Sequence, residues 1–171
     1  MTQSLTPLGA LGRGLLAGVV GTAAMDLVWF ARYKRSGGKD DLVDWEFSAG
    51  LKDWEAAPAP AQVGRRVVEG LFQRDLPADT AALVNNVTHW GYGVAWGGVF
   101  GLVAGSLRSP MPRHGLALGP IAWASGYVVL PLAKLYKPMW EYDPRTLARD
   151  LSAHTVYGLA TAGAFRALVR R

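Results

Sequence analysis

The chain has 171 residues, of which 50% are hydrophobic and 18% charged, and it carries a formal net charge of +5. Soluble domains carry about 25% charged residues, and here the basic residues flank apolar runs instead of alternating with exposed aromatic residues, which argues against nucleic-acid binding. The absence of cysteine excludes disulfides, zinc–thiolate sites and thiol catalysis. The composition favours one membrane domain over residues 1–171.

Residues 14–31 are predicted to form the first membrane-spanning helix. The run is apolar apart from Thr22 and Asp26, and a basic cluster follows it. A cleavable signal peptide is the alternative, but the apolar region of a signal peptide is usually only about 7–15 residues long. This run is longer, so we expect a helix that remains in the bilayer.

Residues 35–79 form a polar insertion. Its first part is rich in acidic residues and glycine and ends in a Pro-Ala linker, which predicts a loop with a short helix. The segment 63–76, VGRRVVEGLFQRDL, places apolar residues on one face of a helix and charged residues on another. This pattern predicts a short amphipathic helix in the membrane interface, or alternatively a loop helix packed on the end of the domain.

The second predicted span contains an uncharged run over residues 85–106. Glycines recur in it at four-residue spacing, in a row that His89 begins: Gly93, Gly97, Gly101 and Gly105. Each glycine costs about 1 kcal/mol relative to alanine in a water-soluble helix, whereas in a membrane such a row lets another helix approach closely. Because the row drifts by about 40° per step around a straight helix, it can face one neighbour only where helices cross at an angle.

Residues 116–135, interrupted by Pro120 and Pro131, and residues 146–168 are predicted as the third and fourth spans. Four spans place both termini on one side of the membrane. Basic residues without acidic neighbours favour the cytoplasm for that side, although a count of all basic residues near helix ends favours the opposite loops. The residues concerned are Arg13, Arg108, Arg113, Arg170 and Arg171.

The second and fourth predicted helices share a motif. Each has the pattern HxxYG with a phenylalanine at the same later offset: His89, Tyr92, Gly93 and Phe100 in one, and His154, Tyr157, Gly158 and Phe165 in the other. The first and third helices share a GxxxG pattern, Gly14 and Gly18 in one and Gly115 and Gly119 in the other. The loops share Trp45-Glu46-Phe47 and Trp140-Glu141-Tyr142.

These matches predict a duplicated helical hairpin. Repeat 1 covers residues 9–107, including the inserted loop 35–79, and repeat 2 covers residues 114–171. Two hairpins of the same orientation are related by an axis along the membrane normal. The expected fold is all-α: an integral membrane four-helix bundle of two tandem hairpin repeats, with a short amphipathic interfacial helix in the first loop.

A Trp-Glu-aromatic loop, a charged helix start and a His-aromatic helix together resemble the YagU-like family of bacterial inner-membrane proteins, a domain of unknown function. The resemblance covers the two hairpins, and the chain departs from it in its long acidic first loop and its many glycines. It implies a multi-pass protein of the bacterial inner membrane with cytoplasmic termini. The family brings no established reaction and no catalytic residues.

The predicted spans contain three ionisable residues at similar depth, Asp26, His89 and His154. Tyr92 and Tyr157 lie one turn along from the histidines. Ionisable residues inside a membrane are candidate functional sites by default. The cluster fits a proton-responsive site, or a haem or divalent-metal site in which the two histidines are ligands. Hydrogen bonds between helices, worth about 0.6 kcal/mol each, are the plainer interpretation.

The Trp-Glu pairs of the loops, Trp45 with Glu46 and Trp140 with Glu141, are interpreted as interface anchors or as an entrance above the histidines. No P-loop, HExxH, GxSxG or EF-hand motif is present in the sequence, and no enzyme is expected.

Three functions remain open. The first is a small proton- or ion-responsive transporter-like or channel-like protein. The second is a structural or partner-binding membrane subunit, in which the glycine row docks a neighbour or a second copy. The third is a bis-histidine haem or metal protein. The bilayer is the expected partner in all three.

Overall fold

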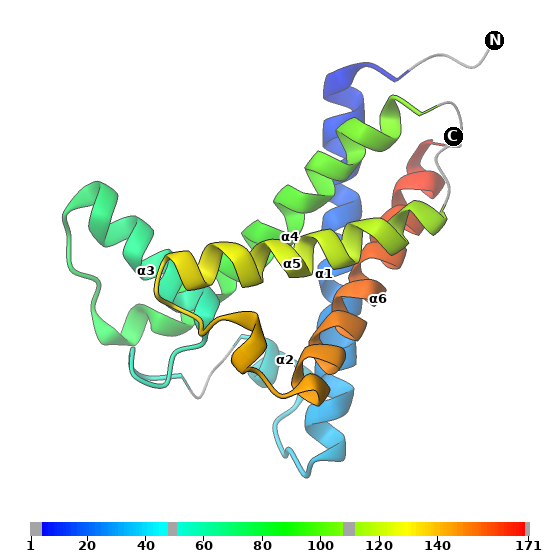
Figure 1. Ribbon diagram of the computed structural model, residues 1–171. Coiled ribbons are helices and arrows are strands. Elements are labelled where there is room, and N and C mark those ends of the chain that lie inside the picture. The colour runs from blue at the N-terminus through cyan, green and yellow to red at the C-terminus, as the bar shows by residue number, and fades with distance from the viewer. Residues whose placement is uncertain (1–4, 48–50, 108–111, 170–171) are drawn as a thin grey trace.

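The computed structural model describes residues 5–47, 51–107 and 112–169, and over these residues its secondary structure is helical, without a strand (Figure 1). The longer helices are α1 (Pro7–Arg35), α3 (Ala59–Phe72), α4 (Ala81–Gly105), α5 (Gly115–Leu132) and α6 (Pro144–Val169). Short helical turns are α2 (Leu42–Glu46), η1 (Ala78–Thr80), η2 (Pro112–His114) and η3 (Met139–Glu141). The prediction of an all-α fold is confirmed. Arg108, Arg170 and Arg171, on which the predicted orientation partly rests, lie outside the described residues.

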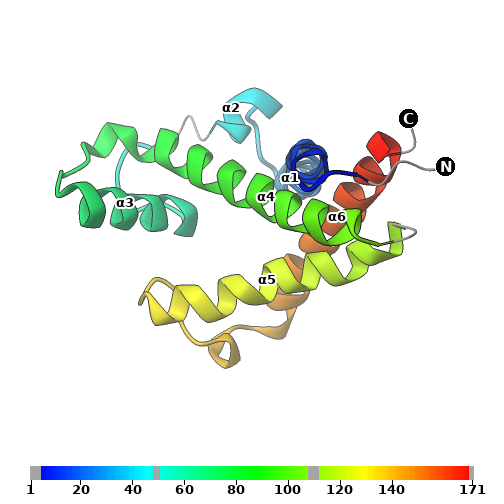
Figure 2. The same ribbon diagram turned by 90° about the horizontal axis from the view of Figure 1, so that it is seen from above.

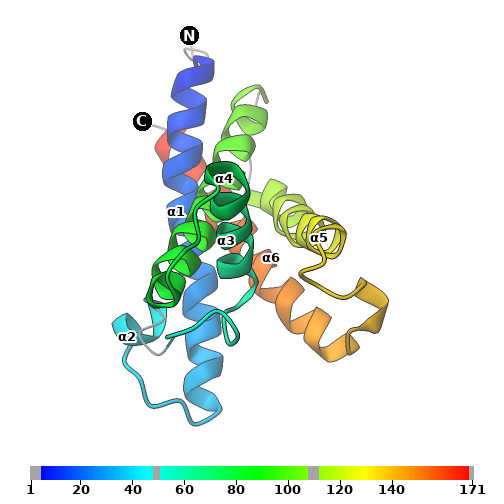
Figure 3. The same ribbon diagram turned by 90° about the vertical axis from the view of Figure 1, so that its left-hand side faces the viewer.

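Helix α1 is the centre of the arrangement. Helices α4 and α6 both pack along it, α5 packs on α6, and α3 packs on α4. The start of α1 and the end of α6 lie at the same end of the molecule (Figure 1). Helix α5 is inclined steeply to α1, as Figure 3 shows by viewing α5 nearly end-on while α1 runs along the page. The helices therefore splay, and α4 and α5 diverge on the side away from α1.

Local sequence signals explain where α1 begins and ends. The hydroxyl of Thr6 accepts a hydrogen bond from the backbone N–H of Gly9 at 3.1 Å, and Pro7 occupies the first turn, where its missing N–H costs nothing. Basic residues fill the last turn, where they face the negative end of the helix dipole. The helix is longer at both ends than the apolar run over 14–31.

The glycine row of α4 faces α1 along its whole length. A Cβ added at Gly97 would lie 2.6 Å from the carbonyl oxygen of Gly14, and one added at Gly101 would lie 2.6 Å from the Cα of Gly14. Gly105 lies likewise against Ala10. One neighbour covers the row because α1 and α4 cross at an angle (Figure 1). The glycine row is thus covered by α1 of the same chain, and it offers no free surface on which a second copy could dock.

A second close contact joins α5 and α6. A Cβ added at Gly158 would lie 2.6 Å from the backbone nitrogen of Gly119, and one added at Gly115 would lie 2.8 Å from the Cα of Leu159. Between α4 and α6, the buried rings of Phe100 and Phe165 meet edge to face. Glycine contacts within each helix pair and an aromatic contact between the pairs thus form the core.

The amphipathic helix predicted in the first loop is α3. It packs on α4, where Gly64 lies against Val84 and Thr88, and its residue Ala61 is fully buried. Leu71 and Phe72 remain exposed. Seen from above, α3 lies beside α4 on the side toward α5 (Figure 2). Its contact with α4 matches the alternative of a loop helix packed on the domain, and a position in the membrane interface stays a prediction.

Two helices of the described chain, α1 and α5, are long and apolar enough to cross a membrane. A core helix of a soluble protein meets the same criterion, as does a signal sequence near the N-terminus. In the most apolar 18-residue windows of α1 and α5, however, only 39% and 28% of the residues are buried. Helix α4 is uncharged but rich in glycine and aromatic residues, and α6 begins with charged residues. Spanning by these two helices stays a prediction.

Candidate functional site

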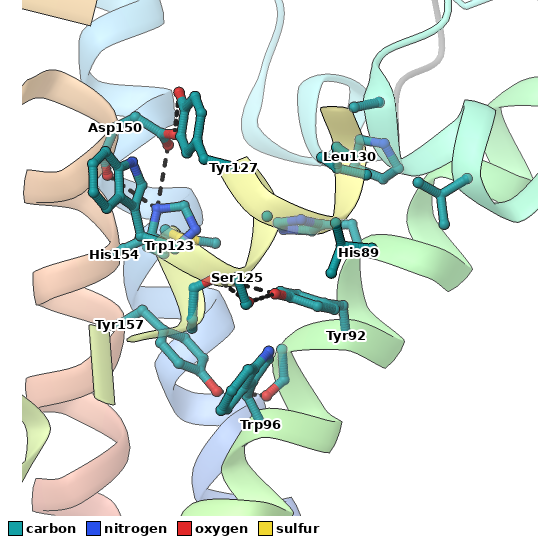
Figure 4. A pocket seen from close by; sticks show the side chains of 18 of the residues that line it. His89, Tyr92, Trp96, Trp123, Ser125, Tyr127, Leu130, Asp150, His154 and Tyr157 are labelled. Atoms are coloured by element: carbon teal, nitrogen blue, oxygen red, sulfur yellow. Dashed lines mark hydrogen bonds and ion pairs between the residues drawn. The ribbon is translucent and has the colours of Figure 1, made fainter. Parts of the chain in front are cut away.

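A cavity of about 450 Å³ lies between α4 and α5, the two helices that diverge (Figure 4). Its volume is within the usual range for a small-molecule site, about 300–1,000 Å³. Helices α4, α5 and α6 supply most of the wall, α1 closes the back, and the first turns of α3 reach the rim. The polar and aromatic lining includes His89, Tyr92, Trp96, Trp123, Tyr127, Asp150, His154 and Tyr157.

The size of the side chains explains why the cavity forms there. Where α1 meets α6, Gly21 lies against Tyr157 and Thr161, and the two backbones come close. Helices α4 and α5 instead turn Trp96 and Trp123 toward the space between them. Indole rings keep helix backbones apart, so this pair stays open and the rings become the cavity wall.

Asp26 and His89 form an ion pair between α1 and α4. The Nε2 atom of His89 lies 2.9 Å from Oδ1 and 3.1 Å from Oδ2 of Asp26. Asp26 is 6% exposed and stands behind the histidine, whereas His89 itself lines the cavity. An ionised carboxylate can only accept, so Nε2 of His89 is the donor in this contact.

His154 has its own carboxylate on α6. Its Nδ1 lies 3.2 Å from Oδ1 of Asp150 and 3.0 Å from the backbone oxygen of the same residue. The other carboxylate oxygen, Oδ2, accepts a hydrogen bond from the hydroxyl of Tyr127 at 3.1 Å. Asp150 and Tyr127 were not among the residues predicted from the sequence. The four-residue spacing of Asp150 and His154 was the available signal, because residues so spaced share a helix face.

The two tyrosines of the repeated motif tie the helix pairs together. Tyr157 donates from its hydroxyl to the carbonyl of Gly93 at 2.6 Å, and Tyr92 donates to the carbonyl of Ala122 at 3.1 Å. Tyr92 also contacts the hydroxyl of Ser125. Four of the five predicted cluster residues therefore line one cavity, and Asp26 supports it from behind.

Glu46 of the first Trp-Glu loop reaches this site. The indole N–H of Trp90 donates to Oε1 of Glu46 at 2.7 Å, and Trp45 packs on Phe30 with ring centroids 5.4 Å apart. Burial and the neighbouring Asp26 carboxylate raise the pKa of Glu46 above its ordinary value. Helix α2 thus holds a carboxylate beside the Asp26–His89 pair.

The tryptophan and glutamate of the second Trp-Glu loop do not line the cavity. Trp140 is 84% exposed, and Glu141 is exposed too. Beside this loop a more open pocket, also of about 450 Å³, adjoins the cavity through Trp29, Tyr127, Tyr136 and Asp150, which line both. Burial, Asp150 and Tyr142 raise the pKa of Tyr136 to about 12. None of the four loop residues lines the cavity, and an entrance formed by either loop stays a prediction.

His89 and His154 lie on opposite sides of the cavity, each with a separate carboxylate (Figure 4). Among the described residues, no group of three or more histidine, aspartate or glutamate side chains is arranged to hold a metal ion. The haem or metal interpretation stays a prediction without a preformed ligand set in that part of the chain.

The chain matches no known protein family, no functionally described protein and no solved structure in the three comparisons made. The resemblance to the YagU-like family therefore stays a prediction from motifs.

Proposed function

We propose that this chain is a proton-responsive, transporter-like protein of the bacterial inner membrane. One observation carries the proposal: two histidines from the two copies of a repeated motif stand on opposite sides of a single cavity, each oriented by its own aspartate. Histidine is the side chain best suited to respond to protons near neutral pH, so a cavity with one histidine on each wall fits a proton-responsive function.

Apolar side chains on the outside of the helices support membrane insertion. Leu16 of α1 is 60% exposed, Val103 of α4 59% and Val129 of α5 59%. Many other large apolar residues of these helices are exposed in the same way. Soluble monomers rarely expose contiguous apolar patches above a few hundred Å², whereas lipid tails cover such surfaces without cost.

Matching contacts in the two hairpins support a duplication. Gly18 of α1 lies against Gly93 of α4, and Gly115 of α5 lies against Gly158 of α6 in the same manner. Gly115 therefore corresponds to Gly18, one turn away from the match with Gly14 that spacing alone suggested. The two contacts between the hairpins differ. Helices α1 and α6 pack directly on one another, whereas the corresponding helices of the other contact, α5 and α4, enclose the cavity.

Helix α3 offers a means by which charge could change access. Its first turns line the rim of the cavity, and the guanidinium of Arg66 donates to the carbonyl of Ala133, just beyond α5. Helix α3 thus spans the opening between α4 and α5. A change of charge at His89 or His154 alters the cavity wall beside α3. Such a change shifts the balance between an arrangement in which α3 covers the opening and one in which it does not.

Membrane topology is the first test. The chain has no cysteine, so single cysteines introduced at exposed positions report their side without background labelling. Lys39→Cys and Lys137→Cys should react with an impermeant maleimide from one side of a sealed vesicle, and Arg113→Cys from the other. Labelling of Lys137→Cys and Arg113→Cys from the same side would show that α5 does not cross, and would reject the four-span arrangement.

The proton response is tested by hydrogen–deuterium exchange in lipid nanodiscs between about pH 5 and about pH 8, the range in which imidazole changes charge. Exchange over residues 59–72, divided by the intrinsic exchange rate at each pH so that it reports protection, should depend on pH in the parent protein. His89→Gln and His154→Gln should each remove this dependence. His114→Gln, which changes the histidine outside the cavity, is the control and should keep it. A dependence that survives both cavity variants would overturn the proposal.

A further inference from the structure

One indole in the cavity wall has a hydrogen-bond donor without a partner. The Nε1 atom of Trp123 is buried and meets no acceptor within the described residues, and the side chain that carries it lines the cavity. A buried N–H that lacks a hydrogen bond costs about 1–3 kcal/mol, so an orphaned donor of this kind calls for an explanation. An acceptor atom of a bound molecule would satisfy it.

A free acceptor lies on the same side of the cavity (Figure 4). Both atoms near Nδ1 of His154 are oxygens of Asp150, so Nδ1 carries the proton of the neutral imidazole. Nε2 is then an acceptor, and no described residue donates to it. The side that carries Trp123 and His154 therefore presents one donor and one acceptor. A hydroxyl group can accept from the donor and donate to the acceptor.

The charges of the wall favour a neutral ligand. Asp150 is the acidic residue that lines the cavity, and Tyr127 and His154 already engage its two oxygens. No lysine or arginine lines the cavity among the described residues. An ionic ligand would lose its hydration without gaining a free counter-charge. The hydroxyls of Tyr92 and Tyr157 are engaged as well, by backbone carbonyls.

The rest of the lining favours an aromatic body. Indole and phenol rings surround the space, from Trp29, Tyr92, Trp96, Trp123 and Tyr127. Aromatic rings prefer offset or edge-to-face contact with other rings, which adds about 0.5–1.5 kcal/mol per pair beyond the burial of area. A flat ring is therefore held better here than an alkyl chain of equal volume.

We propose that the cavity binds a neutral hydroxylated aromatic molecule dissolved in the bilayer, of the phenol or quinol class. Its hydroxyl donates to Nε2 of His154, its oxygen accepts from the indole N–H of Trp123, and its ring packs among the tryptophans and tyrosines. This assignment rests on the proposed function in one respect, namely that the cavity lies in the membrane and opens between α4 and α5.

Two probes that differ in the hydroxyl alone test the assignment. Tritiated 4-nonylphenol and its methyl ether, 4-nonylanisole, are titrated onto nanodiscs that contain the protein, with empty nanodiscs subtracted to remove partition into lipid. The phenol should bind about tenfold more tightly than the ether, the ratio expected for one buried hydrogen bond to a donor–acceptor pair. Equal binding of the two probes would overturn the assignment.

Variants locate the bond. Trp123→Phe should weaken the binding of both probes, because an ether oxygen accepts from the indole N–H as a phenol oxygen does, and its thermal stability should not fall, because the lost N–H has no partner among the described residues. His154→Gln should instead reduce the preference for the phenol over the ether, because this preference measures the bond that the hydroxyl donates to Nε2 of His154. Trp140→Phe alters an exposed indole and is the matched control, which should bind both probes as the parent does. A Trp123→Phe protein that binds the phenol as tightly as the parent does, or a His154→Gln protein that keeps the full preference, would overturn the assignment.

The two proposals fail separately. Loss of the phenol preference, with pH-dependent exchange over residues 59–72 retained, rejects the ligand class and leaves the proton response standing. A retained phenol preference without any pH dependence rejects the proton response and leaves the ligand site.

Discussion

Phe100 of α4 and Phe165 of α6 meet edge to face, with ring centroids 5.8 Å apart. Each is the phenylalanine that follows the HxxYG motif of its helix, so matching positions of the two hairpins touch one another. Contact between equivalent residues is what an axis of approximate symmetry produces at its centre. The pair therefore lies where such an axis would pass.

We expect Phe165→Ala to destabilise the protein by about 3–5 kcal/mol, because Phe165 is fully buried and its removal leaves a void. Phe100→Ala should cost a similar amount. The double variant should cost less than the sum by about 0.5–1.5 kcal/mol, the energy of the ring contact. Reversible unfolding in mixed micelles measures all three. Strict additivity would show that the rings do not interact.

The glycine row provides a pair of matched substitutions on one helix. Gly97→Ala forces a methyl group into the backbone of α1, where Gly14 and Gly18 stand, and should destabilise the monomer by at least about 1–3 kcal/mol. At Gly91 an added Cβ meets nothing within 4 Å, so Gly91→Ala should stabilise α4 by about 0.5–1 kcal/mol. Loss of a dimer from Gly97→Ala, with the monomer intact, would contradict the observed packing.

The Asp26–His89 pair should behave as a unit. His89→Leu leaves the buried carboxylate of Asp26 without its partner and should cost about 3–5 kcal/mol. The double variant, in which Asp26→Leu is added, should recover most of this loss, since two apolar side chains need no partner. A double-mutant cycle on unfolding free energies measures the coupling. Independent effects of the two changes would contradict the pairing.

Glu46 should make the docking of α2 depend on pH. Burial and Asp26 raise the pKa of Glu46 above its ordinary value of 4.5, so the folded protein holds this proton more tightly than the unfolded chain does. The contribution to stability is therefore complete below pH 4.5 and is lost as the pH rises through the raised pKa.

Glu46→Gln should remove this pH dependence and keep α2 docked at neutral pH, because its amide oxygen can still accept from Trp90. The protection of residues 42–46 against hydrogen exchange, relative to the intrinsic rate at each pH, measures docking. The exposed residue Glu141 gives the control, Glu141→Gln, which should change nothing. Weaker docking of α2 in Glu46→Gln than in the parent at neutral pH would contradict the role given to Glu46.

The sequence by itself predicted the helices, because helix formation is governed by neighbours along the chain. Apolar runs, the uncharged stretch over 85–106 and the basic cluster after Ala31 indicate where helices lie. The four-residue glycine spacing likewise predicted a surface for close helix contact. The histidines and tyrosines of the repeated motif stood out because ionisable groups are rare in apolar runs.

The tertiary structure alone decided which surfaces meet. The glycine row of α4 is covered by α1 because those two helices cross at an angle. The crossing angle depends on both helices together and cannot be read from the sequence of either helix alone. The same holds for the choice of Glu46 over Glu141, two residues in similar loops that end in different surroundings.

The cavity has the same origin. The bulky rings on α4 and α5 leave a space between these helices because other contacts fix the two helices in place. Helix α4 is held by α1, and α5 is held by α6, which in turn packs on α1. Spacing along a chain sets which residues share a helix face, but crossing angles and side-chain volumes across the fold set what that face touches.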